Sequence, residues 1–162
     1  LPDMILLTGV TGKTGSEVAR QLAAAGTPFR AIARDAKRAE PVAALKGTEV
    51  VVGDIGDATF LAGALAGVEQ ALLVMPNGEQ QLALEKGFID AAVKAGVRRV
   101  VYLSSLESVP ESPNPITQMH VQAENHLRNS GLDWTILRPT FFMQQFVGSA
   151  PRIRERSEIA MP

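Results

Sequence analysis

The chain has 162 residues, of which 46% are apolar and 20% charged, with no cysteine and a net charge of −1 at pH 7. This length predicts one domain, and the composition excludes a disordered chain, a disulfide scaffold, a cysteine nucleophile and a thiolate metal site. The near-neutral charge argues against a dedicated nucleic-acid-binding protein, and because neither a membrane-spanning run nor an export signal is evident, we expect a cytoplasmic protein.

Short apolar runs alternate with amphipathic segments along the chain. Runs bounded by Gly, Pro or Ser predict strands at 4–7, 29–33, 49–52, 71–75, 99–103 and 134–137. Apolar residues spaced by three and four predict helices at 15–25, 36–46, 57–65, 79–95 and 116–129. The pattern fades after Gly148, where charges predict a solvated segment. These six βα units predict an α/β fold with a doubly wound parallel sheet of the Rossmann type. An antiparallel α+β fold is the weaker alternative, because the predicted strands and helices alternate along the chain and do not form separate runs of strands or of helices.

The loop after the first strand carries the strongest local signal. Glycines stand at Gly9, Gly12 and Gly15, directly before the first predicted helix. In a dinucleotide-binding loop, such glycines permit the tight turn, the close approach of the pyrophosphate and the packing of the helix on the sheet. A nucleoside-triphosphate P-loop does not fit, because Leu7 stands where its first glycine belongs. A glycine-rich turn without a ligand is the alternative.

The end of the second strand bears on the choice of nicotinamide cofactor. A carboxylate there binds a free ribose 2′-hydroxyl, whereas an arginine accepts a 2′-phosphate. Because Arg34 comes first and Asp35 follows, the sequence favours NADPH over NADH. Asp35 could still serve a ribose, and Arg34 could instead form a surface ion pair.

Two later strand ends also bear on a nucleotide. Asp54 and Ile55 follow the third strand, where a carboxylate and an apolar side chain suit an adenine. Asp54 could equally cap the next helix. Met75 and Pro76 follow the fourth strand and would lie beside the same nucleotide.

The proton donor common in short-chain dehydrogenases is absent. The single tyrosine, Tyr102, lies inside a predicted strand, and Leu106 stands where Tyr-x-x-x-Lys requires lysine. His120 and Glu124 share one face of a predicted helix, so Glu124 could orient or charge the imidazole. A surface histidine paired with a carboxylate is the alternative. We predict no metal site, because His126 faces away from His120 and no third ligand is evident.

Several motifs together resemble one family. They are Thr8-Gly9-x-Thr11-Gly12-x-x-Gly15, Arg34-Asp35, Gly53-Asp54, Ser104-Ser105 and Thr135-Ile136-Leu137-Arg138-Pro139. Over 4–148 the chain resembles the NmrA-like group of atypical short-chain dehydrogenase/reductases, which includes quinone reductases, triphenylmethane-dye reductases and non-catalytic redox regulators.

The resemblance implies a role for each matching residue. It assigns the pyrophosphate to Gly9, Thr11, Gly12, Lys13, Thr14 and Gly15, the 2′-phosphate to Arg34, the adenine to Asp54 and Ile55, the adenosine ribose to Met75 and Pro76, the nicotinamide ribose to Ser104 and Ser105, and the nicotinamide to Pro139, Thr140 and Phe141. It also implies that His120 lies near the nicotinamide or the substrate.

Relatives in this group continue for about a hundred further residues, which form a domain that covers the substrate. We therefore expect an NAD(P)-binding domain at 1–148 and, at 149–162, the start of a truncated or absent substrate domain. The apolar side chains of Phe141, Phe142, Met143 and Phe146 would then be exposed or used in association, or would pack under the edge of the sheet.

We expect an NADPH-dependent reductase that transfers hydride to a quinone or a similar conjugated acceptor, with His120 and Glu124 as catalytic residues. The alternative is a non-catalytic NADP(H)-binding redox sensor. A sugar-nucleotide epimerase is disfavoured by the missing Tyr-x-x-x-Lys pair. The expected partner is a small-molecule acceptor rather than a nucleic acid or a membrane. The sequence leaves open whether the protein forms a homo-oligomer.

Overall fold

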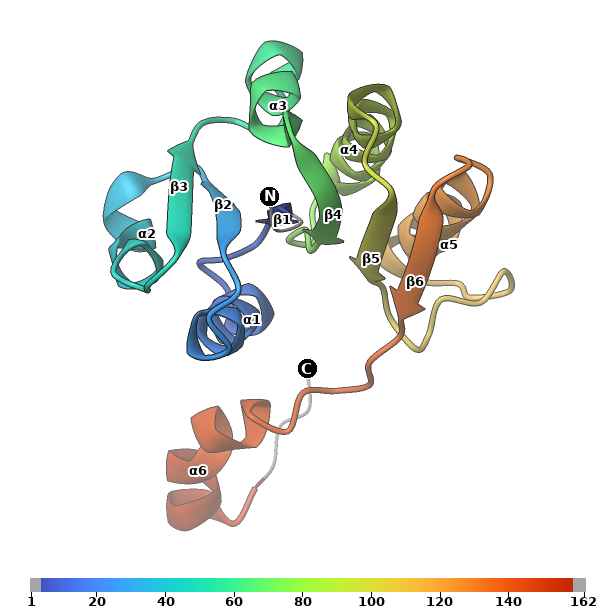
Figure 1. Cartoon of the computed structure of the whole chain (residues 1–162). Coiled ribbons are helices and arrows are strands. Elements are labelled where there is room, and N and C mark those ends of the chain that lie inside the picture. The colour runs from blue at the N-terminus through green and yellow to red at the C-terminus, as the bar shows by residue number, and fades with distance from the viewer. Residues whose placement is uncertain (1–3, 159–162) are drawn as a thin grey trace.

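A computed structural model gives the arrangement of residues 4–158, which form one parallel sheet with helices on both faces (Figure 1). Its elements are β1 (Met4–Leu7), α1 (Lys13–Ala24), β2 (Phe29–Ala33), α2 (Ala36–Ala43), β3 (Thr48–Val52), α3 (Ala58–Leu65), β4 (Val68–Leu73), α4 (Gln81–Ala95), β5 (Arg99–Leu103), α5 (Pro115–Arg128), β6 (Asp133–Leu137) and α6 (Gln145–Arg156).

The strand order is β3-β2-β1-β4-β5-β6, and each neighbouring pair of strands is parallel. The chain moves outward from β1 to β3, returns to the other side of β1, and moves outward again to β6. This order is that of a doubly wound sheet, whose ligands bind beyond the carboxyl ends of the strands where the winding reverses. The predicted Rossmann-type fold is confirmed, and the reversal lies between β1 and β4.

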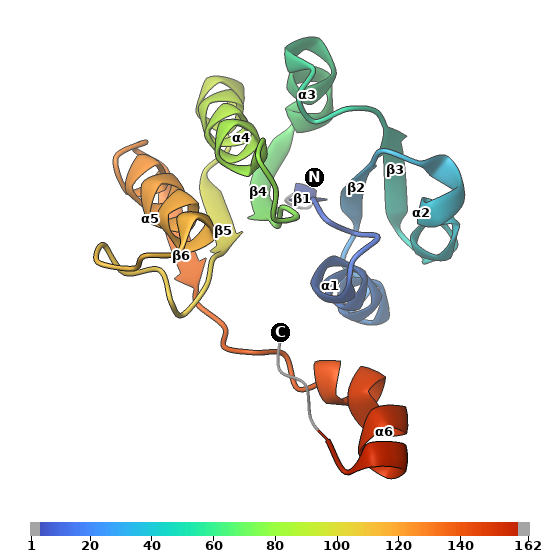
Figure 2. The same ribbon diagram turned by 180° about the vertical axis from the view of Figure 1, so that it is seen from behind.

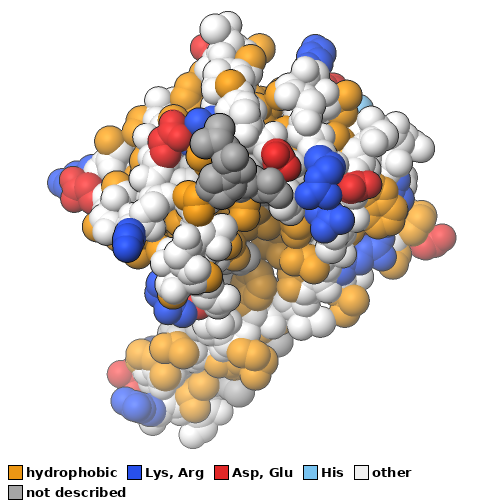
Figure 3. Space-filling model, viewed as in Figure 1, with side chains coloured by type: hydrophobic (Ala, Val, Ile, Leu, Met, Phe, Trp, Pro, Cys, Tyr) orange, Lys and Arg blue, Asp and Glu red, His pale blue; other side chains and the backbone are white. Residues whose placement is uncertain are grey.

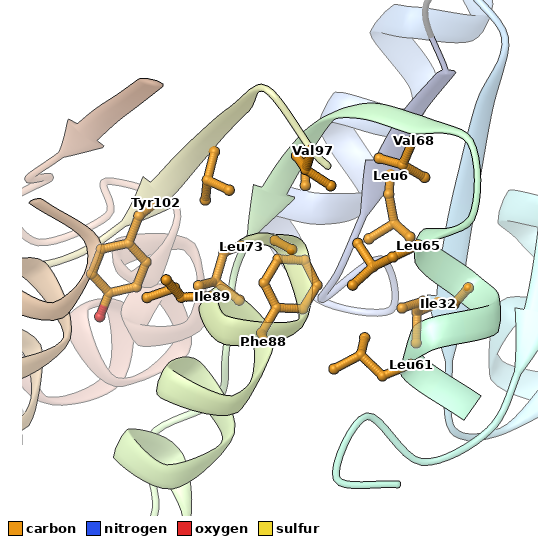
Figure 4. Packing of buried hydrophobic residues seen from close by; sticks show 14 of the residues in the cluster. Leu6, Ile32, Leu61, Leu65, Val68, Leu73, Phe88, Ile89, Val97 and Tyr102 are labelled. Carbon is orange, nitrogen blue, oxygen red and sulfur yellow. The ribbon is translucent and has the colours of Figure 1, made fainter. Parts of the chain in front are cut away.

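Each face of the sheet has its own apolar core, because successive side chains of a strand point to opposite faces. Leu6 belongs to the cluster under α3, α4 and α5, and its neighbour Leu7 belongs to the cluster under α1 and α2. Figures 1 and 2 show these two groups of helices on opposite sides of the sheet. Figure 4 shows part of the larger cluster, with Phe88 and Ile89 of α4 facing Leu73 of β4.

Several predicted boundaries shift by a few residues, two of them for simple reasons. Strand β4 begins at Val68 rather than at residue 71, because Gly67 adopts a φ of 73° and completes the turn from α3. Helix α5 begins at Pro115, where proline is tolerated because the first helical N–H needs no partner. Asn114 caps this helix by accepting a hydrogen bond from the Ile116 N–H at 2.9 Å.

The charged residues after Gly148 are exposed, as expected, but they belong to a helix that was not predicted. Residues Gln145–Arg156 form α6, with Pro151 inside it. Phe146, Ala150 and Ile153 are spaced by four and three and are half-buried along one face. The proline and the neighbouring charges hid this apolar face from a prediction based on sequence pattern.

Helix α6 stands apart from the sheet, on the side of α1, as both ribbon views show. Hydrophobic side chains lie on its surface in Figure 3, and Val147 is 75% exposed. Nearby, Phe142 and Met143 are exposed, whereas Phe141 and Phe146 are half-buried and meet edge to face at 5.4 Å. The expectation of exposed apolar side chains is therefore met at Phe142 and Met143, whereas Phe141 and Phe146 pack against each other. Among the helices of residues 4–158, none is long and apolar enough to cross a membrane.

Candidate cofactor and active site

The loop after β1 is held against β4 by Thr8, whose side chain is buried. The Thr8 hydroxyl accepts a hydrogen bond from the Val74 N–H at 2.7 Å and lies 3.0–3.1 Å from the carbonyl oxygens of Val74 and Leu72. Gly9 follows with a φ of 65° and lies so close to Val74 that a Cβ would stand 2.9 Å from the Val74 carbonyl oxygen. Only glycine meets both conditions without strain.

Gly15 lets the first turn of α1 approach this loop closely. A Cβ at Gly15 would lie 2.3 Å from the Gly9 carbonyl oxygen, which is far inside van der Waals contact. Gly12, which lies between Gly9 and Gly15, closes the turn by donating its N–H to the Gly9 carbonyl oxygen at 2.9 Å. The three glycines therefore form a compact turn that leaves backbone, rather than side chains, at the mouth of α1.

The N-terminus of α1 has no side-chain cap and no acidic residue in its first turn. Asp35, Asp57 and Asn114 cap α2, α3 and α5, whereas α4 and α6 lack a side-chain cap as α1 does. The first N–H groups of a helix lack partners within the helix, and its dipole favours an anion there. The uncapped α1 therefore offers its first N–H groups to a ligand.

A cleft of about 400 Å³ opens beside this helix end. Segments from five parts of the chain meet there: the glycine loop, the end of β4, the end of β5, helix α5 and the segment after β6. The lining residues are Gly9, Gly12, Lys13, Thr14, Val74, Met75, Asn77, Leu103, Ser104, Ser105, His120, Pro139, Thr140 and Phe142. The cleft thus lies at the carboxyl ends of the strands, where the winding of the sheet reverses.

Ten of the site residues predicted from the sequence line this cleft, which shows that distant motifs converge. The predicted residues outside its lining are Thr11, Gly15, Arg34, Asp54, Ile55, Pro76, Phe141 and Glu124. Asn77 and Phe142, the neighbour of Phe141, also line the cleft but were not predicted as site residues.

The two residues after β2 have separate roles. Asp35 accepts hydrogen bonds from the N–H groups of Lys37 and Arg38 at 2.9 and 3.3 Å, and so caps α2. Arg34 is exposed and forms no ion pair with another described residue. Since one oxygen of Asp35 is engaged as a cap, Arg34 is the group at this strand end whose side chain has no ion pair among the described residues.

Asp54 is exposed and accepts a hydrogen bond from the Gly56 N–H at 2.8 Å. It does not cap α3, since Asp57 does. Ile55 packs against the larger core and lines a separate groove between α3 and α4 rather than the cleft.

His120 is nearly buried where it reaches the cleft, and its partners differ from those expected. Its Nδ1 lies 2.6 Å from the Tyr102 hydroxyl oxygen, and the Gln81 Nε2 lies 3.3 Å from its Nε2. The expected contact with Glu124 is absent among the hydrogen bonds of the described residues, because Glu124 has other partners. Burial lowers the pKa of His120, and the charge of Glu124 opposes this shift. The imidazole is therefore neutral at pH 7.

Glu124 is fully buried and lies at the centre of a compact ionic cluster. It accepts hydrogen bonds from the Ser104 hydroxyl at 2.6 Å, from Arg138 Nε at 2.8 Å and from Arg128 Nη2 at 2.9 Å. Arg138 also donates through its Nη2, so the pair is bidentate. Burial raises the pKa of Glu124, but these donors outweigh it, so the pKa lies below its ordinary value. Glu124 thus positions the end of β5 and the start of the segment after β6.

A second buried carboxyl, Glu85 of α4, was missed because nothing in the sequence separates it from a surface glutamate. Its Oε1 accepts a hydrogen bond from Gln81 Nε2 at 3.1 Å. Burial raises the pKa of Glu85 to about 7, and the hydrogen bond from Gln81 together with the nearby Tyr102 hydroxyl opposes this rise. Glu85 therefore titrates near neutral pH. Among the described residues, no group of three His, Asp or Glu side chains could hold a metal ion.

Comparison with known proteins agrees with this geometry. A family model described as NAD(P)H-binding matches residues 9–158. The chain belongs to this NAD(P)H-binding family. Its relatives place it among the NmrA-like atypical short-chain dehydrogenase/reductases, and so confirm the resemblance drawn from the motifs.

Three relatives show the range of this group. The NAD(P)H azoreductase of Xenophilus azovorans is 37% identical over 98% of this chain and 55% of its own length. The structure of the Escherichia coli NADPH-dependent quinone oxidoreductase with NADPH has a TM-score of 0.83 and 32% identity, over 95% of this chain and 55% of that one. The Citrobacter sp. triphenylmethane reductase with NADP(H) has a TM-score of 0.80 and 26% identity, over 93% of this chain and 55% of that one. The chain spans about half the length of these relatives.

The residues present fit a nicotinamide dinucleotide. The glycine turn leaves no room for a Cβ at Gly9 or Gly15, the end of α1 is uncapped, and Lys13 lines the cleft at that end. A pyrophosphate matches these donors in charge and in size.

We predict that Gly15→Ala destabilises the protein, because its methyl group must displace the Gly9 carbonyl. The expected loss is about 1–3 kcal/mol in the free energy of unfolding. Gly87→Ala is the matched control, since Gly87 lies inside α4 and a Cβ added there would have nothing within 4 Å, and it should gain about 0.5–1 kcal/mol. Urea unfolding of both variants measures the difference, and equal effects would contradict the close approach.

We predict that Glu85→Gln stabilises the protein in a pH-dependent manner. The pKa of Glu85 is about 7 when folded, against an ordinary value of 4.5. Glu85 therefore favours the folded state fully below pH 4.5, and this contribution is lost as the pH rises through about 7. The gain from Glu85→Gln should be close to zero at about pH 4.5 and reach about 3 kcal/mol at about pH 8.

Urea unfolding at a series of pH values measures this gain. Taking the difference between variant and wild type cancels the titration of His120, which the two share. Glu69→Gln, an exposed carboxyl at the start of β4, is the control and should show no pH-dependent gain. A gain at Glu85 that does not change with pH would show that this carboxyl is ionised in the fold.

Proposed function

We propose that this protein is an NADPH-dependent reductase that transfers hydride to a quinone or a similar conjugated acceptor. The observation that carries the proposal is the cleft itself, in which the glycine loop and the imidazole of His120 line the same space. The relatives are named as reductases of azo compounds, quinones and triphenylmethane dyes. All three classes of acceptor are conjugated.

The reaction needs hydride, a bound acceptor and a proton. NADPH supplies the hydride when it is bound. Backbone N–H groups at the start of α1, together with Lys13, would hold the pyrophosphate, and Ser104, Pro139 and Thr140 would border the nicotinamide. A conjugated acceptor spreads the negative charge it gains, so a weak acid is sufficient. Neutral His120 carries one ring proton that it can donate to the acceptor, and the Tyr102 hydroxyl lies 2.6 Å from its Nδ1.

The preference for NADPH rests on Arg34. Its guanidinium is exposed beyond β2, and its neighbour Asp35 is engaged as the α2 cap. A guanidinium can donate two parallel hydrogen bonds to a phosphate, whereas a ribose 2′-hydroxyl is usually bound by a carboxylate. Lys37 and Arg38, at the start of α2, add to the positive charge beside the same strand end.

We predict that His120→Gln lowers kcat for NADPH oxidation with a quinone by about 100-fold, because glutamine keeps a polar side chain but cannot donate the proton. The affinity for NADPH should not change. His126→Gln is the matched control: His126 pairs with Asp90 at 2.7 Å away from the cleft lining, and its loss should leave kcat unchanged. Stopped-flow absorbance, corrected for direct reaction of NADPH with the quinone, measures both variants.

Tight NADPH binding by the wild type without turnover of any conjugated acceptor would overturn the reductase proposal. That result would favour a redox sensor that uses the same cleft.

We predict that Arg34→Ala raises the Kd for NADPH by about 10- to 100-fold, the effect of losing hydrogen bonds to a charged group. The Kd for NADH, which has no 2′-phosphate, should change less than twofold. Arg98→Ala is the control, since Arg98 precedes β5, at the amino end of that strand, and lies 3.9 Å from Asp133. Fluorescence titration measures each Kd, and an equal loss for both dinucleotides would rule out a 2′-phosphate contact.

A further inference from the structure

Two walls of the cleft come from the side of the sheet beyond β4. The β5 wall is formed by Ser104 and Ser105, and the β6 wall by Pro139 and Thr140. Figures 1 and 2 show β5 and β6 side by side, with the chain continuing from the end of β6. The pairing extends past the strands, because the Leu106 N–H donates to the Pro139 carbonyl oxygen at 3.0 Å. The two walls are therefore neighbouring segments that each need a fixed position.

Both walls are anchored to one buried carboxylate, that of Glu124. Its Oε1 accepts hydrogen bonds from the Ser104 hydroxyl at 2.6 Å and from Arg138 Nε at 2.8 Å, and its Oε2 accepts from Arg138 Nη2. Because Arg138 directly precedes Pro139, this bidentate contact fixes the start of the β6 wall. The Glu124 side chain is 1% exposed and does not line the cleft. It can act on a ligand in the cleft only through the residues that it holds.

The hydroxyl of Ser104 is committed to this contact. A hydroxyl has one hydrogen to donate, and an ionised carboxylate can only accept. Burial raises the pKa of Glu124, but hydrogen bonds from Arg138, Ser104 and Arg128 outweigh it and hold the pKa below its ordinary value. The Ser104 hydrogen therefore points to Glu124, and the Ser108 hydroxyl, 3.1 Å away, is left to donate to Ser104. Ser104 thus contributes a fixed wall to the cleft rather than a free donor.

We propose that Glu124 is a positioning residue, which holds the β5 wall and the β6 wall at a fixed spacing and so sets the affinity of the cleft for the nicotinamide half of the cofactor. The inference rests on the proposed function, which puts the nicotinamide beside these walls. The phosphate half depends on other contacts, since Thr8 holds the glycine turn against β4. No hydrogen bond among the described residues joins that turn to Glu124 or its partners. The two halves of the cofactor should therefore respond separately to a change at Glu124.

The two arginines bound to Glu124 form a matched pair for testing this role. Their side chains are both 36% exposed, and both donate to Glu124 Oε2. Arg138 carries the β6 wall, whereas Arg128 lies in α5, four residues after Glu124, and also packs over the Trp134 ring at 5.5 Å. Removing either one leaves the carboxylate with one arginine and Ser104. Only the loss of Arg138 disconnects the carboxylate from the β6 wall.

The first measurement needs no cofactor. Arg138→Ala should free the β6 wall, so the Leu106 amide that donates to the Pro139 carbonyl should exchange with solvent about tenfold faster, as expected for the loss of charge-assisted hydrogen bonds. Arg128→Ala should leave this exchange rate unchanged. Amide hydrogen exchange followed by NMR measures both variants, and the amides of β1 are the internal control for global unfolding.

The second measurement compares two ligands by isothermal titration calorimetry. NADPH is the whole cofactor, whereas 2′,5′-ADP has its adenosine and 2′-phosphate but no nicotinamide. In Glu124→Gln and Arg138→Ala, the Kd for NADPH should rise about tenfold, while the Kd for 2′,5′-ADP should change less than about twofold. Arg128→Ala should bind both ligands as the wild type does. A variant that only lowers the folded fraction would weaken both ligands equally, and urea unfolding measures that fraction.

The outcomes separate this inference from the proposed function. Equal losses for NADPH and 2′,5′-ADP, or equal effects of Arg138→Ala and Arg128→Ala, would overturn the positioning role and leave the reductase function standing. Binding of NADPH by the wild type without turnover of any conjugated acceptor would overturn the reductase function and leave the positioning role intact. If the wild type bound 2′,5′-ADP as tightly as NADPH, the nicotinamide would gain nothing from these walls, and the role of Glu124 in its affinity would be wrong.

Discussion

The contact between Gly15 and the carbonyl of Gly9 sets the geometry on which the candidate site depends. Because neither residue has a Cβ, α1 starts within van der Waals distance of the loop that leaves β1. Thr8 fixes the same loop to β4, the strand beyond the reversal of the sheet. Backbone rather than side chains therefore borders the cleft at its phosphate end, and an anion can approach the uncapped helix.

The opposite end of the cleft is built on a different principle. There, buried charge is made tolerable by pairing: Glu124 is surrounded by two arginines and a serine hydroxyl. This cluster joins β5, α5 and the segment after β6, which carries Pro139 and Thr140 to the cleft. Leaving one partner of such a cluster unpaired costs far more than the cluster contributes. The cluster is thus a constraint on the geometry of the site more than a source of stability.

The sequence predicted most of the fold, because strand and helix periodicity and glycine placement are local properties. It also predicted ten residues that line the cleft, since strand ends converge in a parallel sheet whatever their contacts are. It paired His120 with Glu124 because helix spacing was the available information. The true partners, Tyr102 and Gln81, come from β5 and α4, and only the packing of those elements brings them together. The burial of Glu85 could not be predicted for the same reason, since neighbours distant in the sequence decide whether a glutamate is buried.

Helix α6 differs from every other helix in how it is held. It lies off the sheet, its apolar face is only half-buried, and Pro151 removes one hydrogen bond from its interior. Segments with few buried contacts open separately from the body of a protein, at a small free-energy cost. We therefore expect the amide hydrogens of α6 to exchange with solvent before those of β1 at the centre of the sheet. Local opening of the segment that borders Phe142 in the cleft would then be an event separate from global unfolding.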